Sequence, residues 1–125
     1  MSVLIDTSCW IEGLRRDGDP GIRQQIRHLL LSGEAATCSM VLLELWNGAR
    51  GDYEKSQLWM LEDTLINLTI DDTVWKRSKE LASLCHGKGL TIPSTDLLII
   101  AVSLRYDVSL IHSDKHFDLC LGSMD

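Results

Sequence analysis

The sequence predicts an α/β fold with a short central parallel sheet and helices on both of its faces. Short, nearly continuous apolar runs alternate with longer amphipathic segments along the chain. Strands of that kind are typical of parallel sheets, which are buried on both faces and joined by helical crossovers. No repeat or shift in composition divides the 125 residues, so one domain over residues 1–125 is expected.

The first half of the chain is expected to hold two strands and four helical segments. Asp19 followed by Pro20 is a helix start, and Gly33 stands where a left-handed residue ends that helix. Ser39 is expected to cap the next helix, and Asp52 to open the one after it. The expected elements are strands at residues 2–5 and 35–38 and helices at residues 10–14, 20–33, 39–49 and from 52 onward.

The second half is expected to hold two strands and two helices before a polar tail. Residues 94–105 form a helix that is apolar almost all round, which predicts a central position. The remaining elements are strands at 66–70 and 108–111, a helix capped by Asp71 and ended by glycines 87 and 89, and a tail at 113–125 with one short helical turn. Apolar positions on the helices after Asp52 and Asp71 are expected at Leu58, Trp59, Leu61 and Leu65, and at Val74, Trp75, Leu81, Ala82 and Leu84.

The composition excludes some function classes. Twelve basic against 18 acidic residues give a net charge of −6, which counts against a protein that holds nucleic acid by charge alone. It leaves open an enzyme that arranges carboxylates around cations. No apolar run is long enough to cross a bilayer, and no basic segment precedes the first apolar residues, so a cytoplasmic protein is expected. The four widely spaced cysteines are expected to be buried, reduced thiols rather than a zinc site.

Four acidic residues stand where the pattern predicts chemistry. Asp6 and Asp114 follow expected strands, at the sheet edge where functional groups of parallel sheets collect. Glu44 and Asp96 lie within apolar helical segments, where an ionised carboxylate is costly unless it is paired or holds a metal. Taken singly, Asp6 and Asp96 are explained as well by helix capping, Asp114 by an Asx turn, and Glu44 by an outward-facing position. Taken together, they predict one acidic pocket.

Carboxylates brought this close repel one another unless cations neutralise them. An oxygen-only donor set without a nearby Cys or His pair fits Mg²⁺ or Mn²⁺. One such ion can activate a water, and two ions roughly 4 Å apart can serve the attacking and leaving oxygens of a phosphodiester. The pocket therefore predicts phosphodiester hydrolysis without a side-chain nucleophile.

The chain also resembles the PIN-domain ribonucleases, and in particular the VapC-type toxins of bacterial toxin–antitoxin pairs. The resemblance is carried by four segments in family order, which together span nearly the whole chain. They are V-L-I-D-T-S near the start, S-M-V-L-L-E-L around Glu44, I-P-S-T-D-L-L-I-I-A, and L-I-H-S-D-K-H-F-D.

This resemblance implies a single PIN-like domain that cuts single-stranded RNA with one or two Mg²⁺ or Mn²⁺ ions. It makes Asp6, Asp96 and Asp114 the metal ligands and Glu44 the group that orients or deprotonates the attacking water. Supporting roles fall to Thr7, Ser113 and Asp118. The sequence departs from many relatives at His112, where Thr or Ser is common, and at His116, where some carry another Asp.

The resemblance further implies a homodimer and a cognate antitoxin, whose extended or helical segment packs near the active site and reaches a basic side chain into the acidic pocket. Trp10, Trp46, Trp59 and Trp75 are most simply core residues, although one or two could face a partner. The densest basic cluster is either a solvated helix face or the surface that contacts RNA phosphates. Its members are Arg15, Arg16, Arg23 and Arg27.

Three other functions fit parts of the pattern. A phosphatase that forms an aspartyl-phosphate at Asp6 usually needs a second acid two residues later, where this chain has Ser8. A receiver domain needs an acceptor Asp after a central strand, and residues 66–72 fit that poorly. A silent PIN-like binding module is disfavoured because all four acids are present.

Overall fold

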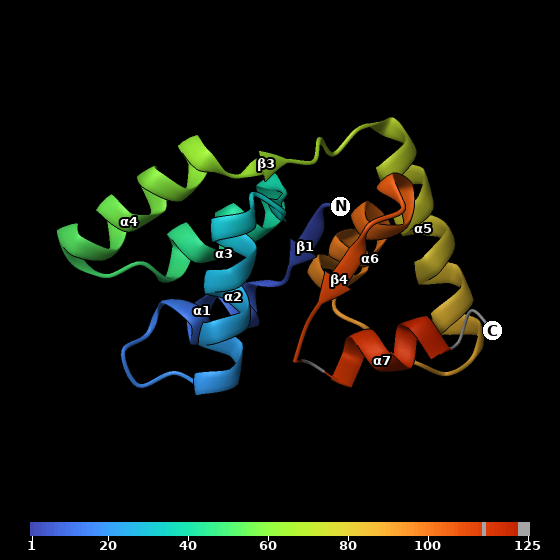
Figure 1. Cartoon of the computed structure of the whole chain (residues 1–125). Helices are drawn as coiled ribbons and strands as arrows, with labels where there is room; N and C mark the ends of the chain where they lie inside the picture. The colour runs from blue at the N-terminus through green and yellow to red at the C-terminus, as the bar shows by residue number, and fades with distance from the viewer. Residues whose placement is uncertain (114, 123–125) are drawn as a thin grey trace.

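The computed structural model describes residues 1–113 and 115–122, and its centre is a sheet of four parallel strands (Figure 1). The strand order is β3-β2-β1-β4, and Leu4 of β1 lies opposite both Ala36 of β2 and Leu110 of β4. This confirms the predicted sheet. The strands are β1 (Val3–Ile5), β2 (Ala35–Thr37), β3 (Ile66–Asn67) and β4 (Ser109–Ile111).

The described residues form seven helices, and two helices lie in each connection between consecutive strands. The chain moves from β1 to β2 to β3 in one direction and then crosses back to β4. Because such crossovers are right-handed, the third connection covers the face opposite to the first two. The helices are α1 (Thr7–Leu14), α2 (Pro20–Ser32), α3 (Ser39–Gly48), α4 (Gly51–Thr64), α5 (Asp72–Gly87), α6 (Ser94–Tyr106) and α7 (Lys115–Gly122).

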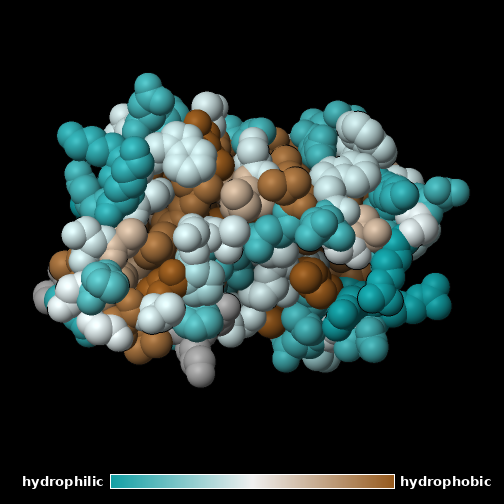
Figure 2. Space-filling view, turned by 180° about the vertical axis from the view of Figure 1, so that it is seen from behind, coloured by the Kyte–Doolittle hydropathy of each residue, from teal (hydrophilic) through white to brown (hydrophobic). Residues whose placement is uncertain are grey.

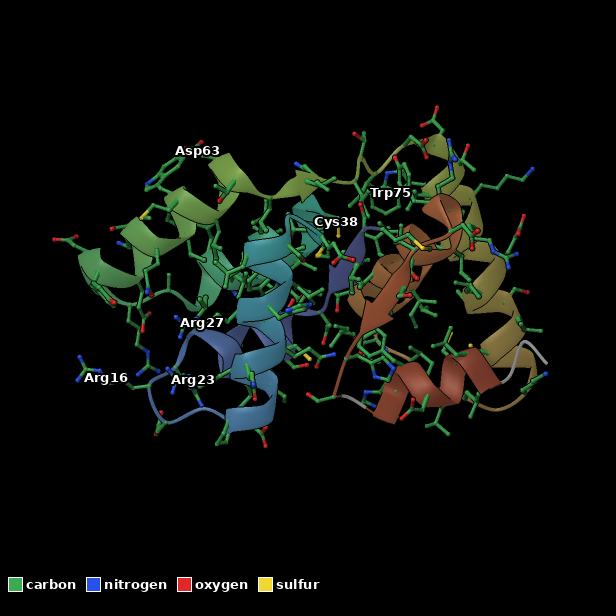
Figure 3. All side chains as sticks on the ribbon, viewed as in Figure 1. Arg16, Arg23, Arg27, Cys38, Asp63 and Trp75 are labelled. Atoms are coloured by element: carbon green, nitrogen blue, oxygen red, sulfur yellow. The ribbon has the colours of Figure 1, made fainter. Side chains whose placement is uncertain are left out.

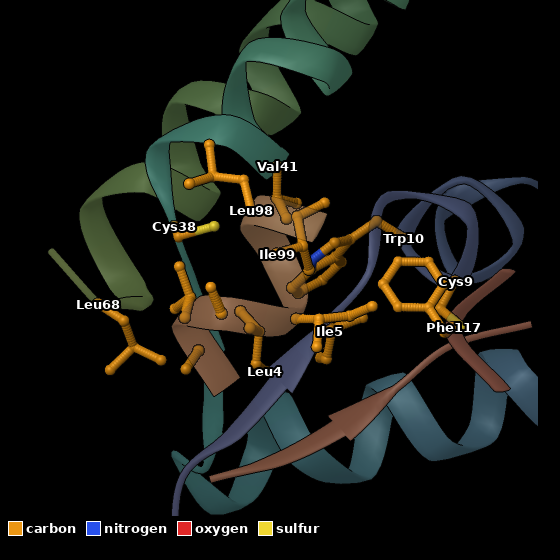
Figure 4. Packing of buried hydrophobic residues seen from close by; sticks show 14 of the residues in the cluster. Leu4, Ile5, Cys9, Trp10, Cys38, Val41, Leu68, Leu98, Ile99 and Phe117 are labelled. Carbon is orange, nitrogen blue, oxygen red and sulfur yellow. The ribbon is translucent and has the colours of Figure 1, made fainter. Parts of the chain in front are cut away.

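Among the helices, α6 contributes the most buried residues to the core, as predicted for the most apolar helix. Residues 97–102 of α6 are all buried, and Ile99 packs among side chains of β1 and α1 (Figure 4). Trp10 of α1 and Phe117 of α7 are the largest fully buried side chains. The core thus joins the two ends of the chain at the carboxyl edge of β1.

Most of the predicted helix ends are confirmed. The Asp19 carboxylate accepts a hydrogen bond from the Ile22 amide at 3.0 Å, and Asp71 does the same for Val74 at 2.9 Å. Gly33 has φ +73°, the left-handed conformation that its position requires. The prediction for Ser39 is wrong: it is the first helical residue of α3, and the capping position before it is held by a cysteine whose side chain forms no capping bond.

Several predicted buried positions are in fact exposed. Trp59 on α4 is 62% exposed, because it follows Leu58 by one residue and is therefore turned about 100° away from the buried face. Trp75 and Leu84 on α5 are 48% and 38% exposed, and Ala82 is exposed as well. Both helices bury a narrow stripe against a small domain, so fewer positions are covered than the apolar pattern indicates.

The sheet and the C-terminal region differ from the expected extents. The third strand has only the two residues of β3, which lie at the edge of the sheet and are exposed. The expected short turn in the tail is an eight-residue helix, α7, because its residues Phe117 and Cys120 are both fully buried. In the part of the chain that the structure describes, no helix is long and apolar enough to span a membrane.

Candidate active site

Asp6 lies at the carboxyl end of β1, where its amide still donates to the Ile111 carbonyl of β4 at 2.9 Å. It is also the N-cap of α1, so the capping interpretation is confirmed. Its Oδ2 atom accepts hydrogen bonds from the amide of Ser8 at 3.3 Å and from its hydroxyl at 2.7 Å. The residue is only 4% exposed. A carboxylate so buried needs such donors or a cation, because desolvation disfavours its charge.

Glu44 is tied to this strand end by a residue next to Asp6. The hydroxyl of Thr7, the first residue of α1, donates to Glu44 Oε1 at 2.8 Å. Glu44 lies in the middle of α3, which packs against α1. It is partly buried, so the outward-facing interpretation does not describe it. The Thr7 bond therefore brings two of the four predicted acids to one place.

The negative charge of this pair affects the pKa values of two neighbouring thiols, Cys38 and Cys9. Burial is the main cause that raises the pKa of Cys38, and the carboxylates of Glu44 and Asp6 raise it further, against the amides of neighbouring residues. Burial raises the pKa of Cys9 as well, again with a contribution from Asp6. In both cases the shift in pKa favours the protonated thiol. All four cysteines are buried, as predicted.

Asp96 is the third residue of α6, and the N-cap of that helix is Pro93. The capping interpretation of Asp96 is therefore wrong. Its Oδ2 atom lies 3.7 Å from Nδ1 of His116 on α7, and its side chain is 14% exposed. The helix α6 packs against α3, which carries Glu44, and against α7. Asp96 is thus held in the first turn of α6, beside α7.

The segment that follows β4 also contacts the site. The Ser113 hydroxyl donates to the hydroxyl of Ser8 at 3.1 Å, so Ser113 is linked to Asp6 through Ser8. Asp118 is 76% exposed, and its Oδ1 atom lies 3.4 Å from His112 Nε2. The His112 ring stacks on Phe117 with centroids 5.0 Å apart. Asp114, the fourth predicted acid, lies outside the described residues.

The donor chemistry fits a hard divalent cation. Asp6, Glu44 and Asp96 offer carboxylate oxygens, which Mg²⁺ and Mn²⁺ prefer. Within residues 1–113 and 115–122, no three acidic, histidine or cysteine side chains form a group that could hold an ion. Two pairs are in place instead: Asp6 with Glu44 through Thr7, and Asp96 with His116.

A hollow of about 580 Å³ opens beside Glu44, between α1, α3 and α4. Its wall combines apolar side chains with cationic ones, and sequence reasoning missed Arg50 and Tyr53, which lie at the start of α4. No sequence signal marks them, because they reach the hollow only through the packing of α3 against α4. The lining residues are Ile11, Leu14, Arg15, Arg16, Glu44, Leu45, Gly48, Ala49, Arg50, Tyr53, Glu54, Gln57 and Leu58.

The predicted basic cluster continues from this hollow. Arg16, Arg23 and Arg27 lie together at the loop between α1 and α2 and along α2 (Figure 3). All of them are exposed, as is Arg15, and the Arg23 guanidinium donates to the Arg16 carbonyl at 2.8 Å. No acidic side chain forms an ion pair with this cluster in the described part of the chain. Its charge is therefore directed to solvent.

Comparisons with known proteins agree with this architecture. The family model of the PIN domain matches residues 3–119 of this chain. A VapC ribonuclease of Mycobacterium bovis and Ribonuclease VapC11 of Mycobacterium tuberculosis are each 32% identical over 122 residues, which cover 94% of this chain and 90% of theirs. VapBC-1 from nontypeable Haemophilus influenzae has a chain with a TM-score of 0.77 at 20% identity, over 98% of this chain and 93% of that one. The chain belongs to the PIN-domain family, and the relatives that it matches are VapC ribonucleases.

Proposed function

We propose that this protein is a Mg²⁺- or Mn²⁺-dependent endoribonuclease and the toxin of a toxin–antitoxin pair, acting in the cytoplasm. The observation that carries the proposal is the bond between Thr7 and Glu44, which joins a half-buried acid to the strand end where Asp6 is buried. The match to VapC ribonucleases over nearly the whole chain supports the same function.

In this proposal, Asp6, Asp96 and Asp114 hold one or two ions at the carboxyl edge of the sheet. A bound divalent cation supplies an activated water and stabilises charge on the scissile phosphate. Glu44 accepts a proton from the attacking water, and Thr7 keeps the carboxylate oriented by donating to its Oε1 atom. Ser8 and Ser113 orient Asp6 through their hydroxyls, and Asp118 has a supporting role at the edge of the site.

The basic cluster is the proposed contact for the RNA backbone. Because the chain carries a net charge of −6, phosphates need a local positive surface near the acidic pocket. Arg15 and Arg16 line the hollow beside Glu44, and Arg23 and Arg27 extend the same charge along α2. Phosphate contacts of this kind position RNA without selecting its sequence.

The same hollow is the proposed seat of a cognate antitoxin. Its apolar walls suit a helical or extended segment, and Glu44 lies within reach of a basic side chain that such a segment carries. Tyr53 is 75% exposed at its rim, so Tyr53→Ala removes contact area without disturbing the core. We expect the variant to retain less antitoxin during co-purification than the wild type. Equal retention would place the antitoxin elsewhere.

A homodimer is proposed through an apolar face. Figure 2 shows hydrophobic residues gathered across the back of the molecule. A second hollow, of about 440 Å³, is lined by Met40, Leu43, Ile70, Trp75 and Leu98 together with three polar residues. Leu43 is 59% exposed and Trp75 48%, which leaves large apolar side chains for a partner. Light scattering after size exclusion tests this, because Trp75→Glu should yield monomers if this face joins two copies.

The ribonuclease is tested by incubating labelled single-stranded and structured RNAs with the purified protein in Mg²⁺, Mn²⁺ or EDTA. We expect cleavage with either metal and none with EDTA. A Glu44→Gln preparation, purified in parallel, controls for contaminating nuclease and should lose activity. Cleavage that persists equally in EDTA or in the variant would contradict the proposal.

A further inference from the structure

The function proposed above makes no use of His116, although this residue faces one of the proposed metal ligands. Its Nδ1 atom lies 3.7 Å from Asp96 Oδ2, and the two side chains are 33% and 14% exposed. His116 lies in the first turn of α7, and Asp96 in the first turn of α6. Two helices that pack together therefore present one nitrogen and one oxygen donor at the same edge of the site.

The separation of these two atoms is informative. A hydrogen bond between a ring nitrogen and a carboxylate spans about 2.7–3.2 Å, so 3.7 Å is too long for a direct one. Ligands of one small divalent cation lie about 2.0–2.2 Å from it. In an octahedral shell two neighbouring ligands are therefore about 3 Å apart, so a closure of less than about 1 Å lets both side chains bind one ion.

The helix that carries His116 is anchored in the core by packing. Phe117 and Cys120 of α7 are fully buried, and the Cys120 sulfur lies 3.6 Å from that of Cys85 on α5. The ring of His112, before the helix, stacks on Phe117. These contacts hold α7, which carries His116, in a defined position, as a metal ligand requires.

We propose that His116 is a nitrogen ligand of the ion that Asp96 holds, and that it makes the site prefer Mn²⁺ to Mg²⁺. The inference rests on the metal-dependent function proposed above and adds a residue outside the acidic set. Mg²⁺ is bound almost entirely through oxygen, whereas the later divalent metals accept imidazole more readily. An imidazole among carboxylates therefore shifts selectivity toward Mn²⁺.

Pulsed electron paramagnetic resonance of the full chain loaded with Mn²⁺ tests this without any measurement of activity. The wild type should show modulation from a directly coupled ¹⁴N nucleus, and His116→Gln should lose it. His28→Gln is the matched control, since His28 is an exposed imidazole on α2 that takes no part in these contacts. We expect this control to keep the signal.

Calorimetric titration with each metal gives a second readout. His116→Asp restores an all-oxygen donor set, so its ratio of Mg²⁺ to Mn²⁺ affinity should rise on the order of 10-fold. Mn²⁺ binding without ¹⁴N coupling in the wild type, or coupling that survives His116→Gln, would overturn the inference and leave the carboxylate site standing. If the wild type binds no Mn²⁺, or binds it as tightly as a variant that lacks the Asp96 carboxylate, the proposed metal site itself would be overturned.

Discussion

Replacing Thr7 with valine isolates the hydrogen bond that joins Asp6's strand end to Glu44. Valine keeps the shape of threonine and removes the hydroxyl that donates to Glu44 Oε1 at 2.8 Å. A hydrogen bond to a charged group contributes about 1.5–3 kcal/mol. Because both side chains are only partly buried, the lower end of that range applies.

A loss of about 1.5 kcal/mol of transition-state stabilisation corresponds to a fall in kcat of roughly 10-fold. The loss belongs to kcat rather than KM, because Thr7 orients the proposed base and does not bind the RNA. Steady-state cleavage of a short fluorogenic RNA measures both constants, and circular dichroism checks that the variant is folded.

Thr7→Ser is the matched control for this variant, since it keeps a hydroxyl at the same position. We expect it to recover most of the lost rate. If Thr7→Val cleaves within about twofold of the wild type, or if Thr7→Ser is equally impaired, the orienting role assigned to this bond is refuted.

Three further predictions concern the frame around the site. Phe117→Ala should lower the free energy of unfolding in urea by about 3–5 kcal/mol, because the ring is fully buried under α7; a loss below about 1 kcal/mol would show that α7 is not part of the core. The Val74 amide and then Arg105 lower the pKa of Asp71, so its contribution to stability is present above the unfolded pKa and is lost as the pH falls through the lower folded pKa. The melting temperatures of the wild type and Asp71→Ala should therefore differ at neutral pH and converge in acid, and a gap independent of pH would contradict this. Burial and a neighbouring thiol raise the pKa of Cys120 to about 12, so it should resist alkylation at mildly alkaline pH until the protein is denatured, and rapid labelling of the native protein would refute its burial.

Local signals predicted most of the fold. The short apolar runs predicted the parallel sheet, and the Asp-Pro pair and Gly33 predicted both ends of α2. Burial on the outer helices was predicted less well, because a periodic apolar pattern does not show how wide a stripe the rest of the domain covers. Trp59 illustrates this, since it lies edge-on to Trp46 with ring centroids 5.1 Å apart and is still largely exposed.

The candidate site was predicted as a set of acids but not as a set of contacts. The sequence predicted that Asp6 follows a strand and that Glu44 lies in an apolar helix. The bond from Thr7 to Glu44 joins residues 37 positions apart, and the approach of His116 to Asp96 depends on how α7 packs. Contacts of that kind follow from tertiary packing, which no local pattern encodes.

The central claim is that a buried carboxylate at the end of β1 supports metal-dependent RNA cleavage. Asp6→Asn tests it most directly, because asparagine is as good a helix cap as aspartate and so preserves the start of α1. The matched control is Asp17→Asn, at an exposed position in the loop before α2. Single-turnover cleavage in Mn²⁺ should fall at least 100-fold in Asp6→Asn and stay unchanged in Asp17→Asn. Cleavage by a folded Asp6→Asn protein at the wild-type rate would contradict the account.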